Sequence, residues 1–490
     1  MPWNPVSSFT FPGGYAMLIW FVAIYMAVSV AIGLYAATRV LNTRDYAVAG
    51  RSLPFYVVMA TVFATWFGSE TVLGIPAKFL EKGLSGVVED PFGSSMCLVL
   101  VGLFFAARLY RMDLLTIGDF YRKRYNPTVE MLTSLAIVAS YLGWVSAQIV
   151  ALGLVFNILS DGALSMQAGM ILGISIVLVY TVFGGMYSVA WTDFMQMTLI
   201  VVGLLYIAWL VGDQAGGIGT VVAHASAAGK FDFFPQPELR DVLWFFGAAI
   251  TMMFGSIPQQ DVFQRVTSAR TVTIAVWATV LGGVFYFIFA FVPMFLAYSA
   301  SLIDPKLVQD HLQKDAQYIL PHLILNHTPV FAQIMFFGAL LSAIMSTASA
   351  TLLAPSVTFT ENVLKRFLRK NLSDRQLLWT MRMVVTGFAL IVIMFALNSD
   401  SNIYEMVGNA YKVTLVAAFV PLIAGLYWKR ATTTGALLSI VFGMGTWVVF
   451  EVTSPDGLIP PQLGGFLAAV VWMVIGSLVT RPSHHLSPHA

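Results

Sequence analysis

The sequence predicts an all-α polytopic membrane protein with about thirteen transmembrane helices. Hydrophobic residues make up 58% of the 490-residue chain and charged residues only 10%, whereas a soluble domain carries about 25% charged residues. The mean hydropathy is +0.80. Apolar runs of about 20 residues recur along the chain, and a run of this length spans a bilayer as a helix because its backbone polar groups are satisfied internally.

Thirteen apolar segments are expected to form these helices. We expect one transmembrane domain over residues 1–490, with peripheral segments at 14–38 and 432–480 and two blocks of five spans at 54–212 and 242–427. The segments cover residues 14–38, 54–82, 88–110, 128–159, 164–184, 186–212, 242–264, 270–300, 329–358, 376–398, 401–427, 432–452 and 460–480.

Basic residues in the connections predict the orientation, because cytoplasmic loops gather Lys and Arg. With the N-terminus outside, 18 of the 26 basic residues fall on the cytoplasmic side, six fall on the other side and two lie inside spans. The cytoplasmic set is Arg39, Arg44, Arg51, Arg108, Arg111, Arg122, Lys123, Arg124, Arg265, Arg270, Lys365, Arg366, Arg369, Lys370, Arg375, Lys429, Arg430 and Arg481. We therefore expect an outside N-terminus and a cytoplasmic C-terminus in a plasma membrane, such as a bacterial inner membrane. The segment MPWNPVSSFT has no basic signal-peptide region, so the first span should stay in the mature protein.

Composition also excludes several classes of protein. The net charge is only +2 and no basic cluster is flanked by aromatic residues, so we expect no nucleic-acid partner. Cys97 is the only cysteine, which excludes an intrachain disulfide. The sequence has no HExxH motif, and all seven histidines lie in loops or the tail, so we expect neither an enzyme nor an organic cofactor. The expected partners are a small solute and membrane lipid, with the protein a monomer or weak oligomer.

Two spans are interrupted where a simple membrane anchor needs no interruption. The second contains ATWFGSETVLGIP (64–76), with Glu70 among glycines, hydroxyl residues and a proline, and the seventh contains MMFGSIPQQDVFQRV (252–266). Proline removes a backbone donor, and freed carbonyls are tolerated at this depth only where they line a cavity or meet an ion. Broken helices at corresponding places of two halves indicate a transporter binding site. The alternative is two packing kinks in a channel or enzyme.

The ninth span carries a row of small and hydroxyl residues, LSAIMSTASATLL (341–353). Ala343, Ser346 and Thr347 share one helical face, with Ser342 and Ser349 beside it. Oxygen atoms of this kind suit a small hard cation. On this motif alone ordinary helix packing is favoured, since small-residue stripes are typical of helix interfaces in membranes.

Several carboxylates and amides lie within or at the ends of the core spans. Intramembrane carboxylates usually face a cavity and mark a pathway, so this set suggests a polar, amine-bearing solute. Alternatives remain for three of them: Glu89 and Asp90 could start a helix facing water, and Asp261 could pair with Arg265 four residues later. The residues are Glu70, Glu89, Asp90, Gln148, Gln259, Gln260 and Asp261.

These segments together resemble the sodium:solute symporter family across nearly the whole chain. The segments that carry the resemblance are GRSLPFYVVMATVFATWFGSETVLGIP, YTVFGGMYSVAWTDFMQM, GSIPQQDVFQRV and GALLSAIMSTASATLL. The resemblance implies thirteen helices. Helices two to eleven would form the five-plus-five inverted repeat of the amino-acid transporter LeuT, with one extra N-terminal and two extra C-terminal helices.

The resemblance also implies a sodium site. The family's main site corresponds to the carbonyls of Ala64, Phe67 and Ala343 and the hydroxyls of Ser346 and Thr347. A second site in some members corresponds to Asp193, Ser346 and Ser349, but Ala350 offers no side-chain oxygen at the next ligand position. The alternative is that Asp193 supports the first site electrostatically.

Within the family, ATWFG, GWVSAQIVALG and SIPQQDVFQRV are similar to the choline-transporter branch. That branch holds a quaternary ammonium in an aromatic cage by cation–π attraction. Trp66 and Trp144 match two cage positions, whereas Ser94 and Gln259 stand at the other two. The proline branch has an aspartate in place of Trp66. The expected substrate-binding residues are Trp66, Glu70, Ser94, Trp144, Gln148 and Gln259.

The expected function is secondary active transport, in which sodium drives symport of a small organic solute into the cell by alternating access. The solute is expected to be an amine or amino acid, choline-like or proline-like. The alternatives are another solute class, such as a sugar, carboxylate or nucleobase, or a sodium-dependent sensor or channel-like protein.

Overall fold

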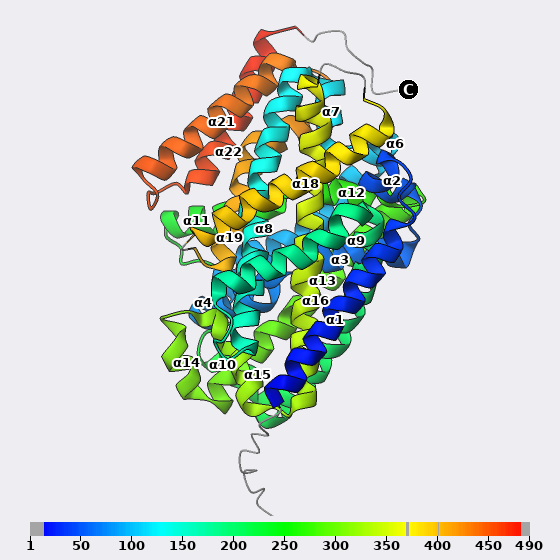
Figure 1. The fold of residues 1–490 in the computed structure, drawn as a ribbon. Helices are drawn as coiled ribbons and strands as arrows, with labels where there is room; N and C mark the ends of the chain where they lie inside the picture. The colour runs from blue at the N-terminus through cyan, green and yellow to red at the C-terminus, as the bar shows by residue number, and fades with distance from the viewer. Residues whose placement is uncertain (1–13, 369–371, 400, 482–490) are drawn as a thin grey trace, which may run out of the picture.

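A computed structural model describes residues 14–368, 372–399 and 401–481, and these residues are almost entirely helical (Figure 1). The all-α prediction is confirmed. The termini and residues Arg369 and Lys370, used above for topology, lie outside the described residues.

The first half of the chain forms helices up to the second interrupted span. They are α1 (Gly14–Ala37), α2 (Thr43–Val48), η1 (Ala49–Arg51), α3 (Phe55–Trp66), η2 (Glu70–Gly74), α4 (Ile75–Lys82), η3 (Gly83–Val87), η4 (Val88–Gly93), α5 (Ser94–Leu100), η5 (Val101–Ala106), α6 (Ala107–Arg111), α7 (Ile117–Arg124), α8 (Pro127–Leu159), α9 (Met166–Gln214), α10 (Ile218–Ala227) and α11 (Leu239–Gly255).

The second half continues from the other side of that interruption. Its helices are α12 (Gln260–Ser268), α13 (Val272–Ile303), α14 (Pro305–Leu312), η6 (Ala316–Tyr318), α15 (Ile319–His327), α16 (Val330–Thr358), η7 (Phe359–Leu364), α17 (Lys365–Phe367), α18 (Asp374–Leu397), α19 (Ile403–Thr414), η8 (Leu415–Phe419), α20 (Val420–Tyr427), α21 (Thr433–Thr453) and α22 (Pro461–Val479).

Ten helical segments of the described chain are long and apolar enough to cross a membrane, or up to eleven if α11 and α12, bent by 45°, form one span. Two places in the chain account for the difference between eleven spans and the thirteen expected. The fifth and sixth expected spans run together in α9, which turns at Gly185 with a φ of 49° that favours glycine. The segment Glu70–Arg111 joins parts of two expected spans and leaves α3 with 12 residues. The number thirteen therefore stays a prediction.

Both predicted interruptions are confirmed. Helix α3 ends at Trp66, and Phe67 leaves helical geometry with φ −90° and ψ 69°. In the second interruption α11 ends at Gly255 and α12 begins at Gln260. Pro258 lies in this gap and lacks the backbone donor that a continuous helix would need.

Helix α16 lies at the centre of the molecule. All its residues from 336 to 358 are buried, as expected for a helix that is apolar or small on every side. It packs against α9, α8 and α3, while α1 lies along α9 and α21 pairs with α22 (Figure 1). The hydroxyl row therefore faces other helices, and one of them is the interrupted α3.

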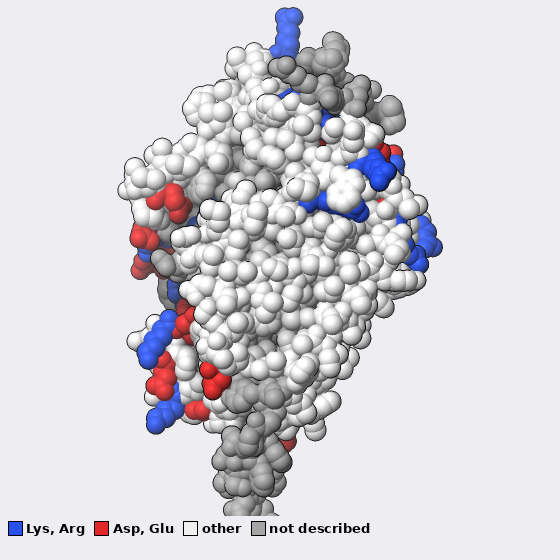
Figure 2. Space-filling view, in the orientation of Figure 1, with Lys and Arg blue, Asp and Glu red and all other residues white. Residues whose placement is uncertain are grey.

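Charge is segregated on the outer surface. Figure 2 shows a broad uncharged band, with mostly Lys and Arg at the upper right edge and both signs along the lower left edge. The upper right edge is the end of the molecule where α2, α6 and α7 lie (Figure 1). Arg265 does not belong with these surface charges, because it is only 1% exposed within α12. It is therefore a buried helix residue and not one of the loop residues that the orientation count assumed.

Candidate functional site

The first interruption places Glu70 against α8. Its Oε1 accepts a hydrogen bond from Trp144 Nε1 at 3.0 Å and its Oε2 accepts one from Gln148 Nε2 at 2.8 Å. Gln148 Oε1 in turn accepts from the backbone N–H of Ser69 at 2.9 Å. A broken helix leaves this N–H without a helical partner. Gln148 therefore accepts its hydrogen bond and at the same time holds the Glu70 carboxylate in place. Glu70 is 2% exposed, so both its oxygens are committed inside the protein.

Aromatic rings surround this carboxylate. The ring centroids of Trp66 and Trp144 are 5.8 Å apart in an edge-to-face arrangement, and Tyr411 of α19 lies 6.0 Å from Trp66 and 5.4 Å from Trp144. Tyr141 stacks on Trp144 with centroids 6.0 Å apart. We call these four residues the aromatic cluster. Tryptophan and tyrosine faces attract cations, so the cluster offers a surface for a positively charged group.

The second interruption reaches the same cluster through Asp261 at the start of α12. Tyr141 donates its hydroxyl proton to Asp261 Oδ1, and the backbone N–H of Asp261 donates to the Tyr141 oxygen at 2.9 Å. Gln259 bonds instead to Ser140 at 2.9 Å and to Thr414 at 3.3 Å. Both broken helices are thus attached to α8 around one set of rings.

A chain of hydrogen bonds leads from the first break to Asp90. Thr71 Oγ1 donates to the Trp66 carbonyl at 3.1 Å and lies 3.1 Å from the Tyr286 hydroxyl. Tyr286 donates to Asp90 Oδ1 at 2.5 Å, and Ser94 donates to the same oxygen. Asp90 is buried, so its alternative as a water-facing helix start is wrong.

Two of the expected sodium ligands, Thr347 and Ala64, lie close together where α16 crosses the end of α3. The Thr347 hydroxyl donates to the Thr65 carbonyl at 2.9 Å and lies 3.4 Å from the Ala64 carbonyl. Phe67, another expected ligand, is the first residue beyond α3, so its carbonyl is freed from the helix at the same place. Two segments almost three hundred residues apart therefore bring oxygen atoms together at a helix break.

Asp193 of α9 lies beside these oxygens. Its Oδ1 accepts from Ser346 at 2.6 Å, and its Oδ2 accepts from Thr61 and, at 3.5 Å, from Thr65. A hydroxyl that donates to a carboxylate keeps its lone pairs for a cation. Ser349 bonds to the Ser346 carbonyl at 3.0 Å and so faces its own helix in this structure.

Arg265 lies next to this group but makes no ion pair within the described residues. Its Nε and Nη2 donate to Thr65 Oγ1 at 3.1 and 2.8 Å, and its Nη1 donates to the backbone carbonyl of Asp261 at 3.2 Å. The alternative that the Asp261 carboxylate pairs with Arg265 is therefore wrong. The guanidinium instead links α12 to α3 at the position next to the freed carbonyls.

The structure brings four of the six predicted substrate-binding residues together. Trp66, Glu70, Trp144 and Gln148 form one contact group, but Ser94 bonds to Asp90 and Pro91, and Gln259 bonds across to α19. Sequence reasoning missed several polar residues of the site. They are Thr61, Thr65, Tyr141, Tyr286 and Tyr411. The spacing of Tyr141, Trp144 and Gln148 on one face of α8 is a signal that could have revealed the first of the tyrosines.

The residues at the centre of the site are buried in this structure. Trp66, Glu70 and Trp144 are buried, and two cavities of the described chain lie elsewhere. One, of about 630 Å³, is lined by mostly apolar residues of η4, α5, α11, α13 and the 233–234 connection, six of them phenylalanines.

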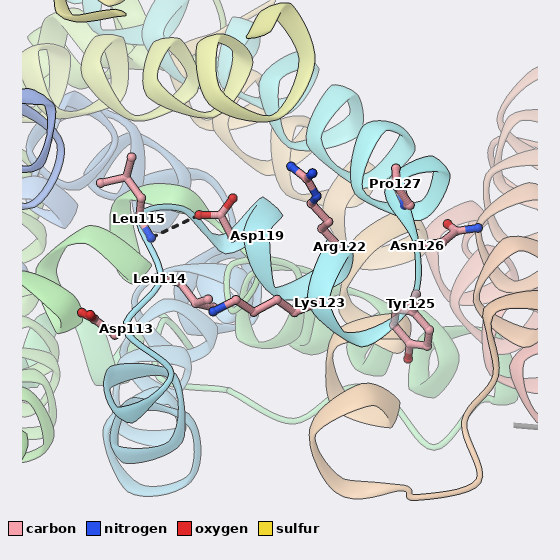
Figure 3. A pocket seen from close by; sticks show the side chains of 9 residues that line it. All are labelled: Asp113, Leu114, Leu115, Asp119, Arg122, Lys123, Tyr125, Asn126 and Pro127. Carbon is pink, nitrogen blue, oxygen red and sulfur yellow. Dashed lines mark hydrogen bonds between the residues drawn. The ribbon is translucent and has the colours of Figure 1, made fainter. Parts of the chain in front are cut away.

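The other cavity, of about 690 Å³, lies between the 113–115 connection and α7 (Figure 3). In it Asp119 accepts a hydrogen bond from the backbone of Leu115 at 3.1 Å. Partial burial raises the pKa of Asp113 at its rim, but the hydrogen bond from Arg51 and the charges of Arg44 and Arg51 outweigh this and hold the pKa below its usual value. This end of the molecule is therefore a charged surface.

Comparisons with known proteins agree with the fold and with the motifs. The model of the sodium:solute symporter family matches residues 46–443. The high affinity choline transporter 1 of Homo sapiens is 28% identical over 454 residues, covering 87% of this chain and 75% of its own. The osmoregulated proline transporter OpuE of Bacillus subtilis is 25% identical over 495 residues, covering 94% of this chain and 95% of its own.

Solved structures give the same fold. A Na⁺-coupled sialic acid symporter in a substrate-bound, outward-open state matches with a TM-score of 0.78 at 20% identity, over 96% of this chain and 99% of its own. MhsT in complex with L-phenylalanine matches with a TM-score of 0.55 at 15% identity, over 86% of this chain and 97% of its own. With the family matched over most of its length and both interruptions in place, the chain belongs to the sodium:solute symporter family and has the LeuT-like fold.

Proposed function

We propose that this protein imports a small organic amine or amino acid by sodium-coupled symport with alternating access. One observation carries the proposal: the Thr347 hydroxyl meets the carbonyls of Ala64 and Thr65 at the end of the broken helix α3. A cation bound between these oxygens, with the Thr347 hydroxyl keeping its proton and turning a lone pair towards the ion, would hold α16 and α3 together. It would therefore favour the arrangement in which these two helices meet, and a ligand that binds one state better shifts the population towards it.

The proposed sodium ligands are the carbonyls of Ala64, Phe67 and Ala343 and the hydroxyls of Ser346 and Thr347. Asp193 supports this site with its charge through Ser346. We propose a single sodium site, because Ala350 has no side-chain oxygen and Ser349 bonds within α16.

Even one sodium ion is sufficient to drive accumulation. A membrane potential of about 100 mV supplies about 2.3 kcal/mol per charge, and a tenfold gradient adds about 1.4 kcal/mol. One-to-one coupling could then concentrate a neutral solute roughly several-hundred-fold.

The solute would bind against the aromatic cluster, with Glu70 and Gln148 at its edge and Ser94 and Gln259 further out. The relatives named above are choline and proline transporters, and the aromatic faces and buried carboxylates suit a solute with a positively charged nitrogen. We also propose that 54–212 and 242–427 are the two inverted repeats, and that the N-terminus is outside and the C-terminus cytoplasmic.

Uptake into proteoliposomes under an imposed sodium gradient tests the proposal. A thermal-shift screen of amino acids, quaternary amines, sugars, carboxylates and nucleobases, each with and without sodium, selects the solute. Labelled uptake should require sodium and should accelerate when the vesicles are preloaded with unlabelled solute. A channel does not show this counterflow, so sodium-independent uptake without counterflow would contradict the proposal.

Glu70→Gln is expected to weaken solute binding about tenfold and to leave the sodium affinity nearly unchanged. The carboxylate accepts from both Trp144 and Gln148, whereas an amide can accept on only one side, so the indole and the Gln148 amide lose their fixed geometry. Solute and sodium titrations of intrinsic fluorescence measure the two affinities separately. Glu81→Gln, at the outer end of α4, is the matched control; a large fall in sodium affinity for Glu70→Gln alone would contradict the assignment.

A further inference from the structure

The break between α11 and α12 carries buried polar atoms that have no hydrogen-bond partner within the described chain. At the break they are Asp261 Oδ2 and the Ser256 hydroxyl, besides Gln260 Nε2, whose side chain bonds to the backbone of α7. The hydroxyl of Tyr411, on α19, is unpartnered too, and Ser256, Asp261 and Tyr411 are buried. Leaving such groups unpaired in a buried site is costly, most of all for a charged group. The unpaired atoms at this break therefore point to a ligand that pairs with them.

These atoms adjoin the aromatic cluster. Asp261 is bonded to Tyr141, whose ring stacks on Trp144, and Trp144 contacts Tyr411. Gly255 packs directly on the Tyr411 backbone, since a Cβ at this glycine would lie 2.4 Å from the Tyr411 carbonyl oxygen. Ser256 follows in the chain. The three unpartnered atoms thus come from the α11–α12 break and from α19, which touch at Gly255 and Tyr411.

The two carboxylates beside the aromatic cluster differ in whether an oxygen remains without a hydrogen bond. Both oxygens of Glu70 accept hydrogen bonds from Trp144 and Gln148. Only Oδ1 of Asp261 is occupied, and Arg265, the cation nearest in sequence, donates to the Asp261 backbone rather than to its carboxylate. Asp261 is therefore the carboxylate with an acceptor to spare, while Glu70 serves to position the rings.

We propose that Asp261 Oδ2, with the Tyr411 hydroxyl, binds an N–H group of the transported solute, which is therefore a protonated primary, secondary or tertiary amine or an amino acid. This inference rests on the proposed function and names its substrate class. A quaternary ammonium can lie against aromatic faces but has no N–H to give, so it would leave Oδ2 unpaired in a buried site. The site should accordingly reject choline in favour of its N–H analogue, because sites built to hydrogen-bond a group discriminate strongly against ligands that lack it.

The experiment uses two matched pairs of probes with the full-length protein in detergent. Dimethylethanolamine and choline differ in one N–H replaced by a methyl group, and proline differs from N,N-dimethylproline in the same way at two positions. Tryptophan fluorescence titrations in sodium and in potassium give the affinity for each probe. We expect the N–H member of at least one pair to bind about tenfold or more tightly than its methylated partner, in sodium.

Variants of single residues test which atoms cause the preference for the N–H probe. Asp261→Asn keeps an oxygen for the Tyr141 hydroxyl but loses the charge, and it should reduce the preference to about twofold. Tyr411→Phe keeps the ring and should weaken the N–H probe while leaving the methylated probe unchanged. Asp310→Asn, an exposed carboxylate on α14, is the control and should behave as the wild type.

Each outcome decides the inference. A wild-type protein that binds the methylated probes equally well or better overturns it, even if the variants fail to fold, and so does an Asp261→Asn protein that keeps the full preference. Sodium-dependent binding of only a sugar or a carboxylate overturns the substrate class but leaves symport standing. If no solute binds or is transported with sodium, the proposed function fails and the inference fails with it.

Discussion

Ser346→Ala and Thr347→Ala are each expected to weaken sodium activation of uptake by about tenfold or more, and the double variant should show no saturable sodium dependence. Each hydroxyl supplies one proposed ligand, and hydrogen bonds or ligands to a charged partner are worth about 1.5–3 kcal/mol. Ser346 also donates to Asp193, so its loss removes the link between that carboxylate and the ion. Sodium titration of initial uptake rates, at saturating solute, measures the effect.

The control for these variants lies on the same helix. Ser356 is buried, and its hydroxyl donates only to the Leu352 carbonyl one turn earlier. Ser356→Ala therefore removes a buried hydroxyl of α16 without touching α3 or α9, and its sodium dependence should match that of the wild type. If both site variants also keep the wild-type dependence, sodium is bound elsewhere or does not drive the cycle.

The two interruptions show what the sequence could predict. Gly68, Gly74, Pro76 and Pro258 disfavour continuous helices, and the structure ends α3 and α11 near them. The hydroxyl row predicted a cation site less well, since the same row is expected at a helix interface. The cation site proposed for this row depends on the contact between α16 and the end of α3, which joins residues too distant in sequence for any local pattern to reveal.

Partner choice among buried charged groups was not predictable from spacing. Asp261 and Arg265 lie one helical turn apart, which suggested an ion pair, but the guanidinium binds Thr65 of another helix. The Asp261 carboxylate instead accepts a hydrogen bond from the Tyr141 hydroxyl. A four-residue spacing only brings two side chains within reach; which contact forms depends on the tertiary neighbours that compete for each group.

Glu405 and Lys412 show the same limit. They lie seven residues apart in the eleventh expected span, a spacing typical of a structural pair or of a snorkelling lysine. In the structure Glu405 is exposed and Lys412 half-buried, and the ion pairs of the described chain do not include them. Similarly, the helix-to-helix turn at Gly185 was hidden from hydropathy, because both sides of it are equally apolar.

Arg265→Gln is expected to destabilise the protein by about 1.5–3 kcal/mol, the usual contribution of hydrogen bonds made by a charged group. The guanidinium is 1% exposed. Its donors to Thr65 and to the Asp261 backbone hold α12 against α3. Without it, the buried carboxylates of Asp193 and Asp261 lose their nearby positive charge. Thermal unfolding in detergent with potassium as the only alkali ion should show a clear fall in Tm, whereas Arg39→Gln, on an exposed arginine, should show none.

If Arg265 only stabilises the fold, a fall in Tm is the only effect expected. If Arg265 also lies near the ion site, the response of Tm to sodium should change as well. Arg265 and a bound sodium would both place positive charge near Asp193, so sodium should stabilise Arg265→Gln by more than it stabilises the wild type. Stabilisation by a ligand grows as RT ln(1 + [L]/Kd), which makes the sodium dependence of Tm a direct comparison of the two affinities. Asp193→Asn in the Arg265→Gln background should recover part of the lost stability, because it removes the unpaired charge, and should abolish the extra sodium effect. Equal sodium shifts in the wild type and in Arg265→Gln would mean that the arginine and the ion do not share Asp193, and the ion site would then have to lie further from α12.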